Sequence, residues 1–329
     1  MIRAMAVAVL VWAAPAAADP VFSIAGTMAA DGNYDTVLAA LKDAHADATT
    51  VSLFWDQLEV NGTYAPPLDW PAIADAVYPG QGLQVSLMIS VLDTTTDRRP
   101  ADLLGLAYDD PVVIARFTTF LTEVLTRMPN VTLTGIGIGN EVDGVLRGDD
   151  WAAYGRFFQA AQKVAHQLRP DVPVGMTITW GGLSGPDATQ ARAMADLGDI
   201  WMVNYYPLLP GFEIDDPANL PATLDAILAA AGHARVALTE VGYPSGGCGA
   251  SEAGQLAFVQ GVLAYGAAHS DRISLISLDW LHDLSADEVA GYVGYYGVGG
   301  DCFAAYLGTL GLRHADATDK PAFEWLRQR

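Results

Sequence analysis

Two glutamates stand at the ends of apolar segments that have the pattern of buried strands. The segment LTGIGIGN (133–140) alternates glycine with other residues and is followed directly by Glu141, and the segment RVALTE (235–240) ends in Glu240. Hydrolysis of a glycosidic bond needs one carboxyl group that keeps its proton for the leaving oxygen. It needs a second, ionised carboxylate that attacks the anomeric carbon or activates water. The two glutamates are therefore the candidate catalytic pair.

Pairing with a basic residue is the alternative role for each glutamate. The chain has 17 Lys and Arg against 38 Asp and Glu, and only Arg147 and Arg235 adjoin the two segments. Side chains alternate faces along a strand, so Glu141 shares a face with the three glycines of its segment. Glycines opposite bulky residues suit the interior of a barrel. The alternation thus predicts that both acids point inward at one rim.

Eight short apolar runs, rich in β-branched residues or glycine, could supply the strands that position these acids. Near-continuous apolar strands are typical of a parallel sheet that is covered on both faces. No Gly-rich phosphate-binding motif follows an early run, which argues against a doubly wound open sheet. The runs cover residues 21–26, 50–55, 83–91, 133–140, 172–180, 199–206, 235–240 and 273–280.

Helical periodicity fills the intervals between these runs. Eightfold alternation of strand and helix without a linker predicts a single (β/α)₈ TIM barrel over residues 19–329. Barrel enzymes carry their chemistry on the loops at the carboxyl ends of the strands, where both glutamates are expected. Apolar residues recur at three- and four-residue steps in 34–47, 112–128, 151–168, 221–232 and 252–268.

Aromatic residues also stand at or just beyond the expected strand ends. Sugar rings present apolar C–H faces that stack on aromatic planes, so these residues are candidates for sugar-binding subsites. A core position with one polar group remains the alternative for each of them. The candidates are Trp55, Trp180, Tyr205, Tyr206, Tyr243 and Trp280.

The N-terminal segment MIRAMAVAVLVWAAPAAA has the features of a secretory signal peptide. Arg3 precedes an apolar run, and small residues precede Asp19. The apolar run is short for a membrane span of roughly 20 residues. We predict a signal peptide over residues 1–18, with cleavage after Ala18, and a secreted or periplasmic protein.

Export makes Cys248 and Cys302 candidates for a disulfide bond, with two buried thiols as the alternative. Both lie in glycine-rich segments, SGGCGA and VGGDCF, where burial of a thiol in the core is less favoured. Neither cysteine has His or Cys partners at the spacing of zinc ligands, and the six histidines are scattered. We therefore expect no metal ion and no other cofactor.

The composition limits the possible partners. A formal net charge of −21 argues against a nucleic acid or an anionic membrane surface as partner. A chain with 51% hydrophobic and 17% charged residues suits a large globular core. The sequence leaves the oligomeric state open.

The residues at the rim resemble those of a known enzyme clan. Asn140-Glu141 after the fourth run and Glu240 at the end of the seventh are similar to the pattern of retaining glycoside hydrolases with (β/α)₈ barrels, clan A. The resemblance implies Glu141 as the general acid/base and Glu240 as the nucleophile. It also implies that Asn140 binds the 2-hydroxyl group of the sugar.

Two further segments are similar to the same clan. The segment Asn204-Tyr205-Tyr206-Pro207 implies Tyr206, or Tyr205 if the register shifts by one, as the hydrogen-bond partner of Glu240. Trp280, which ends the eighth run, matches the aromatic floor of such sites.

The family within the clan is indicated less consistently. TEVGYPSGG (239–247) resembles a segment of the family 17 β-1,3-glucanases, and GNEV (139–142) fits them too. SLFWDQLEVNGTYAPPLDW (52–70) is more similar to the W-x-x-LE-x-x-G-x-Y segment of other families in the clan. The basic residue that many relatives carry at the end of the second strand is absent.

The sequence as a whole indicates an exported, retaining glycoside hydrolase that acts on a β-linked oligo- or polysaccharide, with β-glucan as a candidate substrate. A transglycosylase could use the same site, with a sugar in place of water. A barrel that only binds carbohydrate and a metal-dependent amidohydrolase are alternatives from other classes. The amidohydrolase would need His-x-His in the first strand, which reads VFSIAGT.

Overall fold

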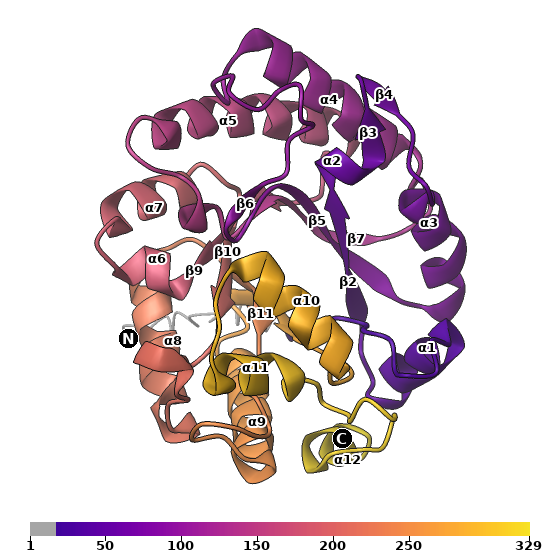
Figure 1. Ribbon diagram of the computed structural model, residues 1–329, viewed down its shortest axis with the longest axis vertical. Coiled ribbons are helices and arrows are strands. Elements are labelled where there is room, and N and C mark those ends of the chain that lie inside the picture. The colour runs from indigo at the N-terminus through magenta and orange to yellow at the C-terminus, as the bar shows by residue number, and fades with distance from the viewer. Residues whose placement is uncertain (1–17) are drawn as a thin grey trace, which may run out of the picture.

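The computed structural model describes residues 18–329 and shows parallel strands surrounded by helices (Figure 1). The predicted signal peptide, apart from Ala18, lies outside the described residues. Neighbouring strands pair in the order β8-β7-β5-β2-β1-β12-β11-β10-β9. Their bounds are β1 (Val21–Ile24), β2 (Ala48–Phe54), β5 (Gln84–Asp93), β7 (Leu133–Asn140), β8 (Val174–Gly175), β9 (Thr177–Thr179), β10 (Trp201–Tyr205), β11 (Val236–Val241) and β12 (Ile273–Leu278).

All eight predicted strand runs are present, and the fifth is divided in two. Strand β8 pairs with β7 and strand β9 pairs with β10, both in parallel. Only Met176 separates them in the sequence. The fifth run therefore joins the two edges of the sheet, and the predicted (β/α)₈ barrel is confirmed as a nearly closed parallel barrel.

Amphipathic helices follow most strands and cover the outside of the barrel (Figure 1). The five predicted helices all form. The first helix, predicted over residues 34–47, ends at Asp43. Two residues later His45 has a left-handed φ of 56°, which a right-handed helix cannot include. The surrounding helices are α1 (Tyr34–Asp43), α2 (Trp55–Leu58), α3 (Trp70–Gln81), α4 (Pro111–Thr126), α5 (Asp150–Leu168), α6 (Trp180–Ser184), α7 (Ala188–Ala195), α8 (Leu220–Ala230), α9 (Glu252–Ala268) and α12 (Pro321–Leu326).

Glycines on β7 make room for methionines inside the barrel. A Cβ atom at Gly137 would lie 2.4 Å from the side chain of Met88 on β5. A Cβ atom at Gly135 would lie 3.1 Å from the side chain of Met202 on β10. The two flexible thioethers fill the volume that larger side chains on β7 would occupy. The expectation that these glycines face the interior opposite bulky residues is therefore confirmed for Gly135 and Gly137.

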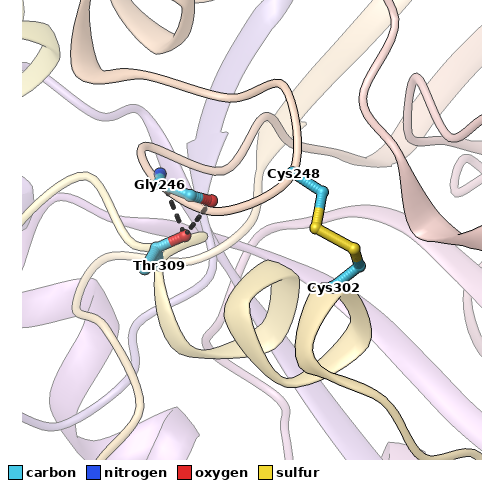
Figure 2. The surroundings of a disulfide bond; sticks show 4 residues. All are labelled: Gly246, Cys248, Cys302 and Thr309. Atoms are coloured by element: carbon cyan, nitrogen blue, oxygen red, sulfur yellow. Dashed lines mark hydrogen bonds between the residues drawn. A yellow bond between two sulfur atoms is a disulfide. The ribbon is translucent and has the colours of Figure 1, made fainter.

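Two helices after β12, α10 (Ala286–Tyr296) and α11 (Asp301–Gly308), lie across one end of the barrel (Figure 1). We call residues 286–308 the roof. The predicted disulfide between Cys248 and Cys302 is present, with 5.4 Å between the Cα atoms. It joins the start of α11 to the loop after β11 (Figure 2). Beside it, the hydroxyl of Thr309 donates to the carbonyl of Gly246 at 3.0 Å, so the end of the roof is held at two points.

No helix within residues 18–329 is both long and apolar enough to cross a membrane.

Candidate active site

A cleft of about 960 Å³ lies at the carboxyl ends of the barrel strands, beneath the roof. Its wall contains residues from strand ends on all sides of the barrel and six residues of the roof. Within the described part of the chain, every charged residue that lines the cleft is acidic: Asp93, Glu141, Asp215, Glu240 and Asp279. The cleft therefore gathers both candidate catalytic glutamates without a neutralising cation in its wall.

Glu141 reaches the cleft because β7 becomes irregular at its last residues. Gly139 has a φ of 89°, and a Cβ atom there would lie 2.2 Å from the hydroxyl oxygen of Tyr154 on α5. Glu141 itself has a left-handed φ of 48°. The predicted strict alternation is wrong at this point, since Gly139 faces the outer helices while the adjacent Asn140 and Glu141 both line the cleft. Only glycine fits the close approach at Gly139.

The surroundings of Glu141 suit a proton donor. The side-chain amide of Asn204 donates to Glu141 Oε1 at 3.1 Å. Loss of hydration inside the protein raises the pKa of Glu141 to about 7, and the nearby carboxylates Asp143 and Asp93 act in the same direction. The hydrogen bonds from Asn204 and Thr94 oppose this shift. A carboxyl group with a pKa of about 7 can keep its proton for a leaving group at neutral pH.

Glu240 lies on β11 beside the partner that the resemblance implied. The hydroxyl of Tyr206 lies 3.0 Å from Glu240 Oε2, and Tyr205 makes no such contact. Burial, Asp279 and Glu141 raise the pKa of Glu240 well above its usual range, whereas the Tyr206 hydrogen bond lowers it. Two buried carboxylates repel one another. The pair of Glu141 and Glu240 is therefore more stable when one of the two groups is protonated than when both are ionised. One acid and one anion is the state that two-carboxyl hydrolysis requires.

An amide network fixes the orientation of Asn140 and Glu141. Asn204 donates through its side chain to Asn140 Oδ1 at 3.2 Å as well as to Glu141. Its own carbonyl oxygen accepts from the hydroxyl of Thr239 at 2.9 Å. Asn140 in turn donates to Asp93 Oδ1 at 3.3 Å. Each amide in the network therefore has a defined orientation, so Asn140 and Glu141 present fixed polar atoms to the cleft.

Three of the six aromatic candidates line the cleft with exposed or polar parts of their side chains. Trp180 begins α6, and Trp280 lies two residues beyond the end of β12; both are partly accessible. The ring of Trp280 packs 5.8 Å from that of Tyr292 on the roof. Tyr206 contributes the hydroxyl described above. These residues border the space in which a ligand near the two glutamates would lie.

The other three aromatic candidates belong mainly to the core. Trp55 is a correction: the chain enters α2 immediately after β2, so its fully buried ring packs on Phe117 of α4 and its N–H donates to Glu59 at 2.9 Å. Tyr243 is a second correction, because beyond β11 its ring is buried against Phe258 of α9, outside the cleft wall. Tyr205 borders the cleft but its ring also packs on Phe258, and it is 5% exposed.

Several residues of the cleft were not identified from the sequence. Asp93 is the last residue of β5, and that position is the signal by which it could have been found. Asn204 and Asp279 were recognised at strand ends from the sequence, but neither was assigned a role in the site. The roof residues lie on helices that the sequence reading omitted, although the segment GYVGYYG (291–297) has aromatic residues at helical spacing. The aromatic roof residues in the cleft wall are Tyr292, Tyr296, Phe303 and Tyr306.

In residues 18–329, no group of three or more His, Cys, Asp or Glu side chains is arranged to hold a metal ion. His282, beyond the eighth strand, is fully buried; its Nδ1 lies 2.8 Å from the carbonyl oxygen of Thr27. The carboxyl groups of Glu141 and Glu240 are of the kind that supply acid–base and nucleophilic chemistry.

No protein-family model matches the sequence, and a search of curated proteins finds no significant relative. The fold, in contrast, is shared with solved structures of glycoside hydrolases. A GH5_18 enzyme from Streptomyces cattleya, in complex with GlcNAc, has a TM-score of 0.71 and 18% identity, over 95% of this chain and 80% of that one.

Two further solved structures show the same likeness. A GH5_18 enzyme from Bifidobacterium longum subsp. longum has a TM-score of 0.73 and 14% identity, over 94% of this chain and 78% of that one. An exo-β-1,4-mannosidase from an Opitutaceae bacterium has a TM-score of 0.70 and 13% identity, over 94% of this chain and 58% of that one. At these identities the likeness establishes the fold, a TIM barrel of the kind found in clan A glycoside hydrolases.

Proposed function

We propose that the protein is a retaining glycoside hydrolase that cleaves a β-linked oligo- or polysaccharide. In this proposal Glu240 attacks the anomeric carbon and forms a covalent glycosyl-enzyme, while Glu141 protonates the leaving oxygen. Glu141 then removes a proton from the water molecule that releases the sugar. The same site would act as a transglycosylase if a second sugar replaced that water.

One observation carries the proposal: two buried glutamates from distant strands line a single cleft, and each has a different hydrogen-bond partner. Asn204 contacts Glu141, and Tyr206 contacts Glu240. A barrel that only bound carbohydrate would gain nothing from two buried carboxyl groups in an acidic cleft, since each unpaired buried charge costs folding free energy. Their retention in this position supports a catalytic role.

The substrate class is proposed from the cleft and from the structural neighbours. Two of the similar solved structures are complexes with Manβ1-4GlcNAc or GlcNAc, and a third is an exo-β-1,4-mannosidase. We therefore place β-1,4-mannosides first in a substrate panel that also contains β-glucans, galactans and xylans. The solved structures described above are not family 17 enzymes, so we assign the chain to the clan and not to the β-1,3-glucanases.

The proposed nucleophile is tested by chemical rescue. Glu240→Ala should abolish turnover of an activated aryl β-glycoside, because no side chain can form the glycosyl-enzyme. Added azide should enter the space left by the carboxylate and yield a glycosyl azide of inverted configuration, which NMR identifies.

The matched variant is Glu141→Ala, in which azide should instead give a product of retained configuration, since the nucleophile is intact. Normal activity of Glu240→Ala, or the same azide product from both variants, would refute the assignment of roles.

We also propose that the protein is exported. The disulfide between Cys248 and Cys302 supports an oxidising compartment. N-terminal sequencing of the mature protein should begin at Asp19; a mature chain that still begins at Met1 would contradict the signal peptide.

A further inference from the structure

The hydroxyl group of Tyr206 lies between two carboxyl groups, and only one of them belongs to the proposed catalytic pair. Its oxygen is 3.0 Å from Glu240 Oε2 and 3.1 Å from Asp279 Oδ2. Asp279 is the last residue before Trp280 and is 8% exposed. The proposed mechanism assigns no task to this third carboxyl group, although it stands one side chain away from the nucleophile.

Counting protons restricts the states of this group of three. A phenol has one proton and can donate it to one acceptor at a time. If Glu240 and Asp279 were both ionised, one of them would face the Tyr206 oxygen without a proton between the two atoms. Burial raises the pKa of Tyr206 well above its usual range, so the phenol keeps its proton. A second proton on one of the two carboxyl groups completes both hydrogen bonds.

The charges around the group favour that second proton. Glu141 after β7 and Asp93 on β5 are the other carboxyl groups that act on this pair, and Tyr292 and Tyr306 approach from the roof. No Lys, Arg or His lines this part of the described structure. Loss of hydration raises the pKa of Asp279 to about 7. A pair of buried acids without a cation shares a proton near neutral pH.

We propose that Asp279 is a positioning residue that shares this proton with Glu240 through Tyr206, so that Glu240 is ionised and oriented for attack in the state in which Asp279 holds the proton. Neutral Asp279 donates to the Tyr206 oxygen, and the Tyr206 hydroxyl therefore donates to Glu240. When the proton starts on Glu240, it passes to the Tyr206 oxygen while the phenol proton passes to Asp279. One proton enters the phenol and one leaves it, so no outside acid or base is needed.

The inference rests on the proposed nucleophilic role of Glu240 and predicts a particular pH profile. As pH rises, Asp279 ionises, and the Tyr206 hydroxyl can then donate to only one of the two anions, Glu240 or Asp279, at a time. Ionisation of Glu141 removes the general acid. Two ionisations should therefore act on the alkaline side of kcat/KM. Loss of the general acid gives a limiting slope of −1 on logarithmic axes, and ionisation of Asp279 adds a further fall of about tenfold, so the descent around pH 7 is locally steeper than −1.

Asp279→Asn is the diagnostic variant, because the amide donates to Tyr206 as the neutral acid does but cannot ionise. It should keep kcat/KM at pH 6 within about threefold, and its alkaline descent should have a slope of −1 throughout, without the steeper region around pH 7. Asp279→Leu removes the donor as well, so it should lose about tenfold in kcat/KM at the same pH, the value of about one hydrogen bond. Asp215→Asn, which removes another carboxyl group of the cleft wall, should leave the steeper descent around pH 7 in place.

An infrared measurement tests the shared proton without turnover. At pH 6, the difference spectrum between Glu141→Gln and Glu141→Gln/Asp279→Asn should contain the carbonyl band of one protonated carboxyl group. Absence of that band, or an Asp279→Asn profile with the slope of the wild type, would overturn the inference. If the Glu240→Ala rescue fails while the band is present, the proposed function is wrong and the shared proton stands.

Discussion

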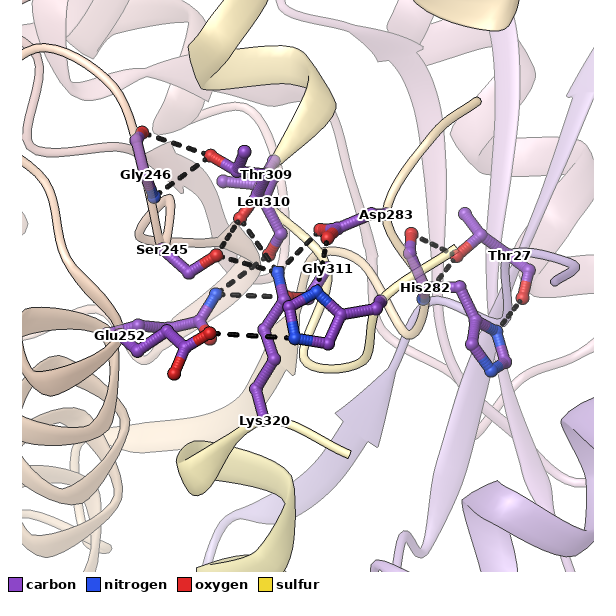
Figure 3. A network of polar contacts seen from close by, with 12 residues as sticks. Thr27, Ser245, Gly246, Glu252, His282, Asp283, Thr309, Leu310, Gly311 and Lys320 are labelled. Carbon is purple, nitrogen blue, oxygen red and sulfur yellow. Dashed lines mark hydrogen bonds and ion pairs between the residues drawn. The ribbon is translucent and has the colours of Figure 1, made fainter. Parts of the chain in front are cut away.

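Asp279 and Asp283 are four residues apart after β12, yet they lie in opposite electrostatic surroundings. Asp283 Oδ1 accepts from Lys320 Nζ at 2.6 Å (Figure 3). The same ammonium group, fully buried, also donates to Ser245 Oγ and to the carbonyl of Gly311, both at 2.7 Å. Asp279 instead has a shared phenol hydroxyl and two neighbouring glutamates, with no cation.

The difference separates a structural use of a buried acid from a catalytic one. The Lys320 group joins the start of α12 to the loops after β11 and β12, and its hydrogen bonds offset much of the cost of burying charge. His314 extends it at the surface, 3.6 Å from Asp283 and 3.5 Å from Glu252. The carboxyl groups of the cleft have no cation to offset the cost of burying their charge. Proteins retain such a destabilising arrangement where it serves activity.

The comparison is tested most strongly by neutralising one acid of each kind. Glu240→Gln should reduce turnover by about 10³-fold or more, as removal of a catalytic nucleophile does. It should also raise the melting temperature, because an acid repelled by its neighbours becomes a neutral amide. Calorimetry and kinetics on the same preparation measure both effects.

Glu59→Gln is the matched control, since Glu59 is a buried glutamate that, unlike Glu240, is paired with an arginine, Arg116. It should lower the melting temperature and leave kcat unchanged. If both variants lose stability, the contrast between the two kinds of acid fails.

Removal of the cation from the structural group should give the next largest effect. Lys320→Met should lower the free energy of unfolding by about 3–5 kcal/mol, because Asp283 is left buried without its partner. Urea denaturation measures the loss. Adding Asp283→Leu should recover part of this loss, since no unpaired charge then remains. If Lys320→Met is as stable as the wild type, the pair does not hold the C-terminal segment.

The pH dependence of stability should sharpen the contrast. The pKa of Glu141 and of Asp279 is raised to about 7, so between pH 4.5 and 7 the folded chain holds protons that the unfolded chain has released. The free energy of unfolding then falls as pH rises, by up to about 1.4 kcal/mol per pH unit for each group. Relative to wild type, Glu141→Gln should gain stability across this window, as melting temperatures would show. A constant difference would contradict the raised pKa.

The smallest effects should separate aromatic residues of the cleft from those of the core. Trp180→Ala should raise KM by about fivefold to tenfold, the value of about one aromatic contact with a sugar ring, and leave the melting temperature nearly unchanged. Trp55→Phe should leave KM unchanged and cost about 1–3 kcal/mol of stability, because Glu59 loses a buried hydrogen-bond donor. If Trp55→Phe raised KM and left stability unchanged, Trp55 would belong to the candidate site after all.

The strand order and the positions of both glutamates followed from the sequence because they depend on local patterns. Near-continuous apolar runs specify buried parallel strands, and the last residue of each run falls at the rim of the barrel. The disulfide was also predictable, since only two cysteines are present.

The details of the site were less predictable, because they depend on backbone irregularities and on tertiary packing. The positive φ at Gly139 turns two successive side chains toward the cleft, which no period-2 pattern can express. Trp55 leaves the rim because a helical turn starts one residue earlier than the apolar run suggests. The position of the roof over the cleft depends on contacts between segments that are far apart in the sequence.

The interlocking of glycine and methionine within the barrel has a consequence for protein engineering. A larger residue at Gly137 would overlap the thioether of Met88 on the neighbouring strand, so neither position can change in size by itself. Libraries that vary the two codons together, with bulk gained at one and lost at the other, should yield soluble variants that libraries of single changes miss. The paired change is the route for reshaping the barrel interior beneath the proposed catalytic glutamates.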